Sequence, residues 1–199
     1  MVVGVSIGVA LLALLAIADL IRKGREATRW REYLFLFSAT LVCMAYGLAH
    51  DMIAVTIAPE YFLGPWPPSS GIWNARAMAA LAAMKGTWWA GLILGAAMLL
   101  ANNPSQRWPQ LSRLCMYRKL IYPFLGAGVL AFILGAVAWS GWLGEWPEAG
   151  DNEKLRRIEC VLYVDYGAYL GGFLAGIATV LLILHQRKKL ALLISKKDI

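Results

Sequence analysis

The run LIYPFLGAGVLAFILGAVAWSGWLG (residues 120–144) contains no charged side chain. A helix that crosses a bilayer needs about 20 mostly apolar residues, so this run is long enough to span a membrane. Four other segments of the chain have the same apolar character and a similar length. The five predicted spans are residues 2–21, 33–54, 77–101, 120–144 and 166–185. The sequence therefore predicts an all-α integral membrane bundle of about five transmembrane helices.

The composition leads to the same fold class. Of the 199 residues, 60% are hydrophobic and 16% are charged, whereas about 25% of a soluble domain is charged. The length is that of a single domain, residues 1–199, and a soluble domain of this size cannot bury so much apolar surface. The net charge of +7 comes from basic residues that fall in separate blocks between the apolar runs. This spacing predicts a lipid bilayer as the partner, and it argues against nucleic acid.

The positions of the basic residues predict the orientation of the chain. Residues 22–32, 102–119 and 186–199 carry five, four and five of the 19 Lys and Arg residues. Because cytoplasmic loops are enriched in Lys and Arg, we expect the N-terminus outside and the C-terminus in the cytoplasm. Eight of the twelve acidic residues fall on the opposite side from these basic blocks. These counts predict a multi-pass membrane protein with this orientation.

The first apolar segment has the length of a signal peptide but not its charge pattern. A signal peptide carries positive charge before its apolar core. Here no basic residue precedes residues 2–21, and five follow directly in residues 22–32. We therefore expect a retained helix that enters the membrane from outside.

Two outer loops are long enough to have structure of their own. Residues 59–75 contain four prolines, which favour extended or turn geometry over helix, and Pro59 is expected to end the second span. In the loop 145–165, Asp151 is a suitable N-cap. We expect a helix from about Asn152 that continues without a break into the fifth span.

The candidate functional residues begin with the His50-Asp51 pair near the outer end of the second span. Polar residues at membrane depth usually face protein or water rather than lipid. Neighbours on a helix are about 100° apart, so the two side chains are expected to point in different directions. His50 shares a face with Tyr46 and Cys43, which favours a position inside the bundle. The plainer alternative is an interfacial histidine that is hydrogen-bonded to a neighbouring helix.

Two further carboxylates are expected at the same level. Glu60 follows the turn at Pro59 and can reach the layer of His50, although a solvated loop glutamate is the alternative. Asp165 lies on a stripe of residues spaced by three and four positions, the packed face of a helix. Its alternative role is a structural ion pair with Lys85 or Arg76. Lys85 itself lies within the third span, where an ammonium group must extend to water or meet a carboxylate.

These residues suggest one polar cluster at the extracytoplasmic membrane boundary. The tentative ligand- or metal-binding residues are His50, Asp51, Glu60 and Asp165, with Lys85, Tyr61, Tyr166 and Tyr169 in support. One imidazole and several carboxylates can bind a divalent metal. They can equally relay protons, because histidine titrates near neutral pH. The residues alone do not decide between these two chemistries.

Two stretches of the chain resemble a known group of sequences. YGLAHDMIAVTIAPEYF (residues 46–62) and KGTWWAGLILG (residues 85–95) are similar to an uncharacterised family of bacterial multi-pass membrane proteins with an HD-x-[IV]-[TS]…PEYF…TWW-x-G pattern. The resemblance covers about a third of the chain and implies that Asp165 to Tyr169 belong with the motif. In that group the last helix carries a histidine where this chain has Asp165 or Tyr166, so no shared ligand set is carried over. The group has no assigned activity, and the resemblance implies no function.

Three classes of function follow from these observations. The first is a small membrane protein that binds or conducts an ion, a proton or a small polar ligand at the predicted cluster. The alternative is a non-catalytic accessory subunit of a larger membrane complex or a homo-oligomer, suggested by small-residue faces such as Gly4/Gly8 and Gly172/Gly176. An enzyme is the least favoured class, because the sequence lacks a recognisable nucleophile–base arrangement.

Overall fold

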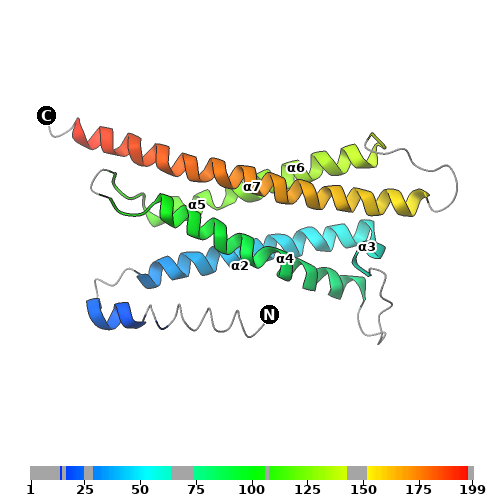
Figure 1. Cartoon of the computed structure of the whole chain (residues 1–199), viewed down its shortest axis with the longest axis horizontal. Helices are drawn as coiled ribbons and strands as arrows, with labels where there is room; N and C mark the ends of the chain where they lie inside the picture. The colour runs from blue at the N-terminus through cyan, green and yellow to red at the C-terminus, as the bar shows by residue number, and fades with distance from the viewer. Residues whose placement is uncertain are drawn as a thin grey trace.

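The computed structural model describes residues 14, 17–24, 29–63, 74–105, 108–142 and 152–196, and this part of the chain is helical without any strand (Figure 1). The elements are α2 (Arg29–Ile57), α3 (Pro59–Leu63), α4 (Ala75–Ala101), α5 (Arg113–Lys119), α6 (Ile121–Trp139) and α7 (Asn152–Ser195). The predicted first span, residues 2–21, lies largely outside the described residues.

Four of the described helices are long and apolar enough to cross a membrane. They are Arg29–Ile57, Ala75–Ala101, Arg113–Trp139 (α5 continued by α6) and Glu153–Ser195. The prediction of an all-α fold with helices long enough to span a membrane is therefore confirmed for this part of the chain, and the fifth span and the orientation stay predictions. As expected, α7 begins at Asn152 and continues without a break. Its 44 residues rise about 66 Å, well beyond the about 30 Å of hydrocarbon in a bilayer.

Two predicted boundaries are wrong, and each has a local cause. The span predicted to run to residue 144 ends at Trp139, because Gly141 takes a positive φ of 79° that an α-helix does not allow. The loop predicted to be extended after Pro59 begins with a short helix, α3, although α2 does end just before it, at Ile57. A proline is well suited to the first turn of a helix, because its missing N–H would lack an intrahelical partner there.

The long helices form two closely packed pairs, α2 with α4 and α6 with α7, and there are fewer contacts between the pairs (Figure 1). Glycines permit the close approach within each pair. A Cβ at Gly91 on α4 would lie 2.6 Å from the Thr40 Cα on α2, and Gly126 on α6 faces the backbone of Gly171 on α7. Such small-residue contacts are typical of membrane helix packing.

The small-residue face predicted for a partner contacts the chain's own helices instead. The nearest atom to a Cβ built at Gly172 belongs to Ala127 on α6, and the nearest atom at Gly176 belongs to Leu94 on α4. The other suggested pair, Gly4 and Gly8, lies outside the described residues. Gly172 and Gly176 are therefore used within the bundle.

Buried apolar residues form clusters at the two ends of the bundle. One cluster includes Phe35, Met98, Leu120 and Ile183, so the four long helices all contribute to it. The other is small and contains Ala54, Ala58 and Val161, against which α3 packs. We call these the Arg187 end and the His50 end, after the polar residues that mark them.

Arg187 of α7 is only 3% exposed and meets no carboxylate among the described residues. Its guanidinium donates instead to four backbone carbonyl groups at and after the end of α4. These acceptors are the carbonyl oxygens of Ala101, Asn103, Trp108 and Pro109. The sequence placed Arg187 among the basic residues of the C-terminal tail, but its side chain is a packed part of the fold. It fixes the connection between α4 and α5 against α7.

We predict that Arg187→Ala lowers the free energy of unfolding by about 3 kcal/mol, because it leaves buried carbonyl groups without a donor. Lys188→Ala is the matched control, since Lys188 is exposed on the next position of the same helix. Thermal unfolding of both variants in the same detergent measures the difference. Equal midpoints for the two variants would contradict the structural role of Arg187.

The contact between α6 and α7 gives a second prediction. A Cβ at Gly171 would overlap the carbonyl oxygen of Gly126, whereas a Cβ at Gly172 would lie 3.5 Å from Ala127, an ordinary contact distance. Gly171→Ala should therefore destabilise the protein by about 1–3 kcal/mol through overpacking. Gly172→Ala should be neutral or stabilising by up to about 1 kcal/mol, because alanine favours helix. The same thermal unfolding measurement distinguishes them.

Candidate functional site

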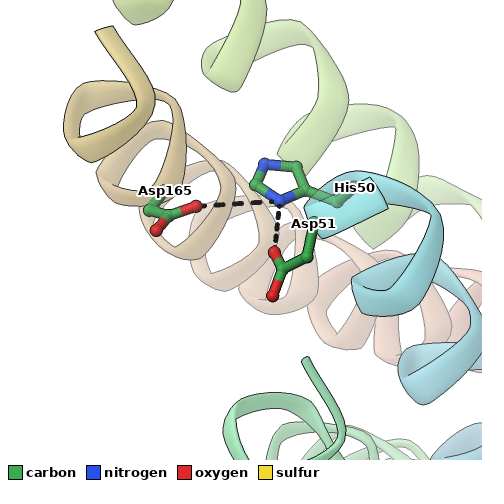
Figure 2. Close-up of side chains that lie close together, drawn as sticks. All are labelled: His50, Asp51 and Asp165. Carbon is green, nitrogen blue, oxygen red and sulfur yellow. Dashed lines mark hydrogen bonds and ion pairs between the residues drawn. The ribbon is translucent and has the colours of Figure 1, made fainter. Parts of the chain in front are cut away.

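The central group of the site consists of His50 and Asp51 on α2 and Asp165 on α7. The His50 Nδ1 atom lies 3.0 Å from Oδ1 of Asp51 and 3.7 Å from Oδ1 of Asp165. In Figure 2 both dashed lines meet at this nitrogen, with one carboxylate coming from each helix. Ligand atoms of the three residues all lie within 4.8 Å of one another. We call this group the His50 site.

The inward position of His50 is confirmed, but its relation to Asp51 was predicted incorrectly. The His50 side chain is 13% exposed, and its ring centroid lies 6.0 Å from that of Tyr46, on the same face of α2. The Cα–Cβ bonds of helix neighbours diverge by about 100°. The side chains of His50 and Asp51 nevertheless turn toward each other, so that their polar ends meet.

Tyr61 of α3 is the fourth member of the polar arrangement. Its hydroxyl donates a hydrogen bond of 2.8 Å to Oδ2 of Asp165. Burial raises the pKa of the Tyr61 phenol above its ordinary value, and the nearby Asp165 carboxylate raises this pKa further. The phenol therefore remains protonated at neutral pH and acts as a donor. The small residues Ala54 and Ala58 lie beneath α3 and allow it to fold back over the site.

The two ring nitrogens of His50 have different surroundings. Two carboxylate oxygens face Nδ1, so in the absence of a metal this nitrogen carries a proton and donates. The Nε2 atom is buried and has no hydrogen-bond partner among the described residues. In Figure 2 it is the ring nitrogen that neither dashed line reaches. The site thus contains an unused polar atom, and such atoms are uncommon in protein interiors.

Glu60 was predicted as a further ligand, but its carboxylate is paired elsewhere. Oε1 of Glu60 lies 3.5 Å from a terminal guanidinium nitrogen of Arg157 on α7. Glu60 and Tyr61 are neighbours on α3, and only Tyr61 faces Asp165. The spacing of residues on α7 contains a signal for this pair. Arg157, Val161 and Asp165 recur at four-residue steps, and therefore lie on one face of α7.

The predicted supporting residues lie in different places. Lys85 is exposed and forms no ion pair with any carboxylate that the structure describes, so the suggested pairing with Asp165 is absent. The hydroxyl of Tyr169 lies against the backbone of Gly86, next to Lys85. Tyr166 is 57% exposed, and its ring meets the edge of Tyr163. Of the three tyrosines, only Tyr61 touches the central carboxylates.

The residue types and spacing of the His50 site suit a divalent metal. Zn²⁺ binds imidazole nitrogen and carboxylate oxygen at about 2.0–2.2 Å, so two adjacent ligand atoms stand roughly 3.0–3.5 Å apart around the ion. The distances of 3.0 Å and 3.7 Å from Nδ1 to the two carboxylates are close to this range. A proton on Nδ1 and a metal on Nδ1 are alternatives, because both require the same lone pair.

The His50 site forms one end of a cavity of about 870 Å³ that runs between the two helix pairs. Most of its wall is apolar, and the polar residues His50, Asp51, Tyr61 and Asp165 belong to its lining. A volume of this size is in the usual range for pockets that hold small molecules. The site is therefore connected to a long apolar space.

No protein-family model, curated protein or solved structure matches the chain. The geometry and chemistry of the His50 site and of the cavity beside it are therefore the basis for a proposed function.

The hydrogen bond from Tyr61 to Asp165 can be tested directly. We expect Tyr61→Phe to lower the free energy of unfolding by about 1.5–3 kcal/mol, because it removes a bond to a charged acceptor. Tyr166→Phe provides the control, since that side chain is exposed. Thermal unfolding in detergent at neutral pH measures both changes. A loss of the same size in Tyr166→Phe would show that the bond to Asp165 is not the cause.

Proposed function

We propose that this chain is a small polytopic protein of the bacterial inner membrane that binds a cation at its extracytoplasmic boundary. The His50 site holds either protons or one divalent metal ion, and His50, Asp51 and Asp165 are the binding residues. The observation that carries the proposal is the position of His50 Nδ1 between carboxylates from two different helices. The resemblance to bacterial multi-pass proteins supports the choice of membrane.

The charges of the site favour a cation. Two carboxylates face one imidazole, so the site is negative whenever His50 is neutral. No Lys or Arg of the described residues forms an ion pair with Asp51 or Asp165. Carboxylates removed from bulk water are strongly stabilised by a bound positive charge. A proton on His50 supplies one such charge, and a divalent ion supplies two.

With the orientation expected from the basic residues, the site lies on the extracytoplasmic side of the membrane. The 22-residue step from Asp165 to Arg187 rises about 33 Å along α7, close to the about 30 Å thickness of the hydrocarbon. With Arg187 and the C-terminal basic residues at the cytoplasmic boundary, Asp165 lies near the outer one. A cation can then reach the site from the extracytoplasmic side.

We predict that the purified protein binds Zn²⁺ or Mn²⁺ and that His50→Ala and Asp165→Asn each weaken this binding by about tenfold or more. Isothermal titration with each metal measures the affinity. Binding should weaken as the pH falls and should release protons, because the metal displaces a proton from Nδ1.

Two control variants make the experiment specific. His185→Ala removes the only other histidine, which is exposed near the opposite end of α7, and it should leave the affinity unchanged. Glu60→Gln should also leave it unchanged, because Glu60 is paired with Arg157. If the wild-type protein binds neither metal more tightly than His50→Ala does, the metal-binding function is wrong.

A further inference from the structure

The cavity beside the His50 site is an elongated groove between the two helix pairs. Its lining extends along α7 from Asp165 to Leu181, a step of 16 residues that rises about 24 Å. Tyr46 and Phe124 contact each other deep within it, where α2 faces α6. Beyond its polar end, the groove is lined almost entirely by apolar side chains. Its length is therefore comparable to most of the hydrocarbon thickness.

The groove is open on the side formed by α4 and α7. The apolar residues along this opening are themselves exposed: Trp89 and Ile93 on α4 are 45% and 60% exposed, and Phe173 and Ile177 on α7 are 66% and 45% exposed. In a membrane, such an opening faces lipid rather than water. A hydrophobic molecule can therefore enter sideways from the bilayer.

The charged groups of the groove gather near its polar end. Lys85 belongs to the lining, and the backbone of the next residue, Gly86, lies against the Tyr169 hydroxyl. Tyr169 is one turn, about 6 Å along the helix axis, from Asp165. The backbone that carries Lys85 thus lies beside Tyr169, one turn farther from the polar end than Asp165, and the carboxylates of Asp51 and Asp165 lie beyond it. A matching ligand has an apolar tail, then an anionic group, then a cationic group.

We infer that the groove binds a phospholipid whose head group carries a primary amine. The phosphate lies at Lys85, the ammonium group lies at Asp51 and Asp165, and an acyl chain follows the apolar wall toward Leu181. This inference rests on the proposed cation-binding role of Asp51 and Asp165. It identifies the cation as the ammonium group of a lipid. A phosphate beside Lys85 also provides the counter-ion that no described carboxylate gives this side chain.

The head group follows from the hydrogen-bonding groups on the protein. Carboxylates accept hydrogen bonds, and a primary ammonium group has three N–H donors. A quaternary ammonium group has the same charge but no N–H donor, and a glycerol head group has no positive charge. We therefore expect ethanolamine lipid to bind more tightly than choline or glycerol lipid with the same acyl chains.

Native mass spectrometry of the full-length protein in detergent tests the inference. The protein is mixed with equal amounts of phosphatidylethanolamine, phosphatidylcholine and phosphatidylglycerol that share one acyl composition. Retention of the ethanolamine lipid should exceed that of the other two by about tenfold, the effect of losing one charge-assisted hydrogen bond. Asp165→Asn should remove this preference. Lys85→Gln should lower the retention of all three lipids, because each carries the phosphate, whereas Lys85→Arg should keep it.

Two controls test whether these variants act at the groove and remain folded. Lys188→Gln removes an exposed lysine at the other end of α7 and should keep the lipid preference. Thermal unfolding of each variant shows that it is folded, and Lys85→Gln is expected to be, because Lys85 is exposed. Equal retention of the three lipids by the wild-type protein would overturn the inference. So would a dimer without lipid, which would mean that a second copy covers the groove.

Metal binding and lipid retention, measured on the same variants, test the cation site and the lipid inference separately. Lys85→Gln should leave Zn²⁺ binding in lipid-free detergent unchanged, since Lys85 is not one of the metal-binding residues. If metal binding depends on Asp165 but lipid retention shows no preference, the lipid inference fails and the cation site stands. If ethanolamine lipid is retained selectively but neither metal binds, the metal-binding function fails and the amine is the cation of the site.

Discussion

The fold depends on a single constraint: each buried ionisable side chain needs a polar partner. Arg187 satisfies it with four backbone carbonyl groups around the end of α4, which joins the elements at one end of the bundle. His50 and Asp165 satisfy it with each other and with Tyr61 at the opposite end. An unpartnered charge in hydrocarbon is costly, so these contacts fix which helices meet at each end.

Between the two ends, the size of the side chains controls the packing. Glycines bring α2 against α4 and α6 against α7 so closely that backbone atoms meet. Between the pairs, larger side chains such as Tyr46 and Phe124 meet, and the helices remain farther apart. The groove is the consequence of two tight pairs joined less tightly to each other. The His50 site lies where this groove reaches the polar end of the bundle.

Hydropathy alone predicted the described spans well, because a helix that crosses a bilayer needs a long apolar run, and such runs can be read from the sequence. Periodicity also placed Asp165 on the packed stripe of α7, where the structure has it. The partner of Glu60 depended on which side of α3 faces α7, and a five-residue helix has too little periodicity to reveal this. The end of α6 depended on the single backbone conformation of Gly141. The meeting of His50 with Asp51 depended on side-chain rotation, which helix geometry leaves open.

The position of the site also links its charge to the arrangement of the helices. His50 and Asp51 belong to the pair α2–α4, whereas Asp165 belongs to the pair α6–α7. Carboxylates from the two pairs repel each other unless a positive charge lies between them. A cation at the site, whether a proton on His50, a metal ion or an ammonium group, therefore holds the two pairs together at this end. The sparse packing between the pairs does little to replace such a contact. Any ligand that binds in the groove and the stability of the groove's walls are therefore thermodynamically coupled.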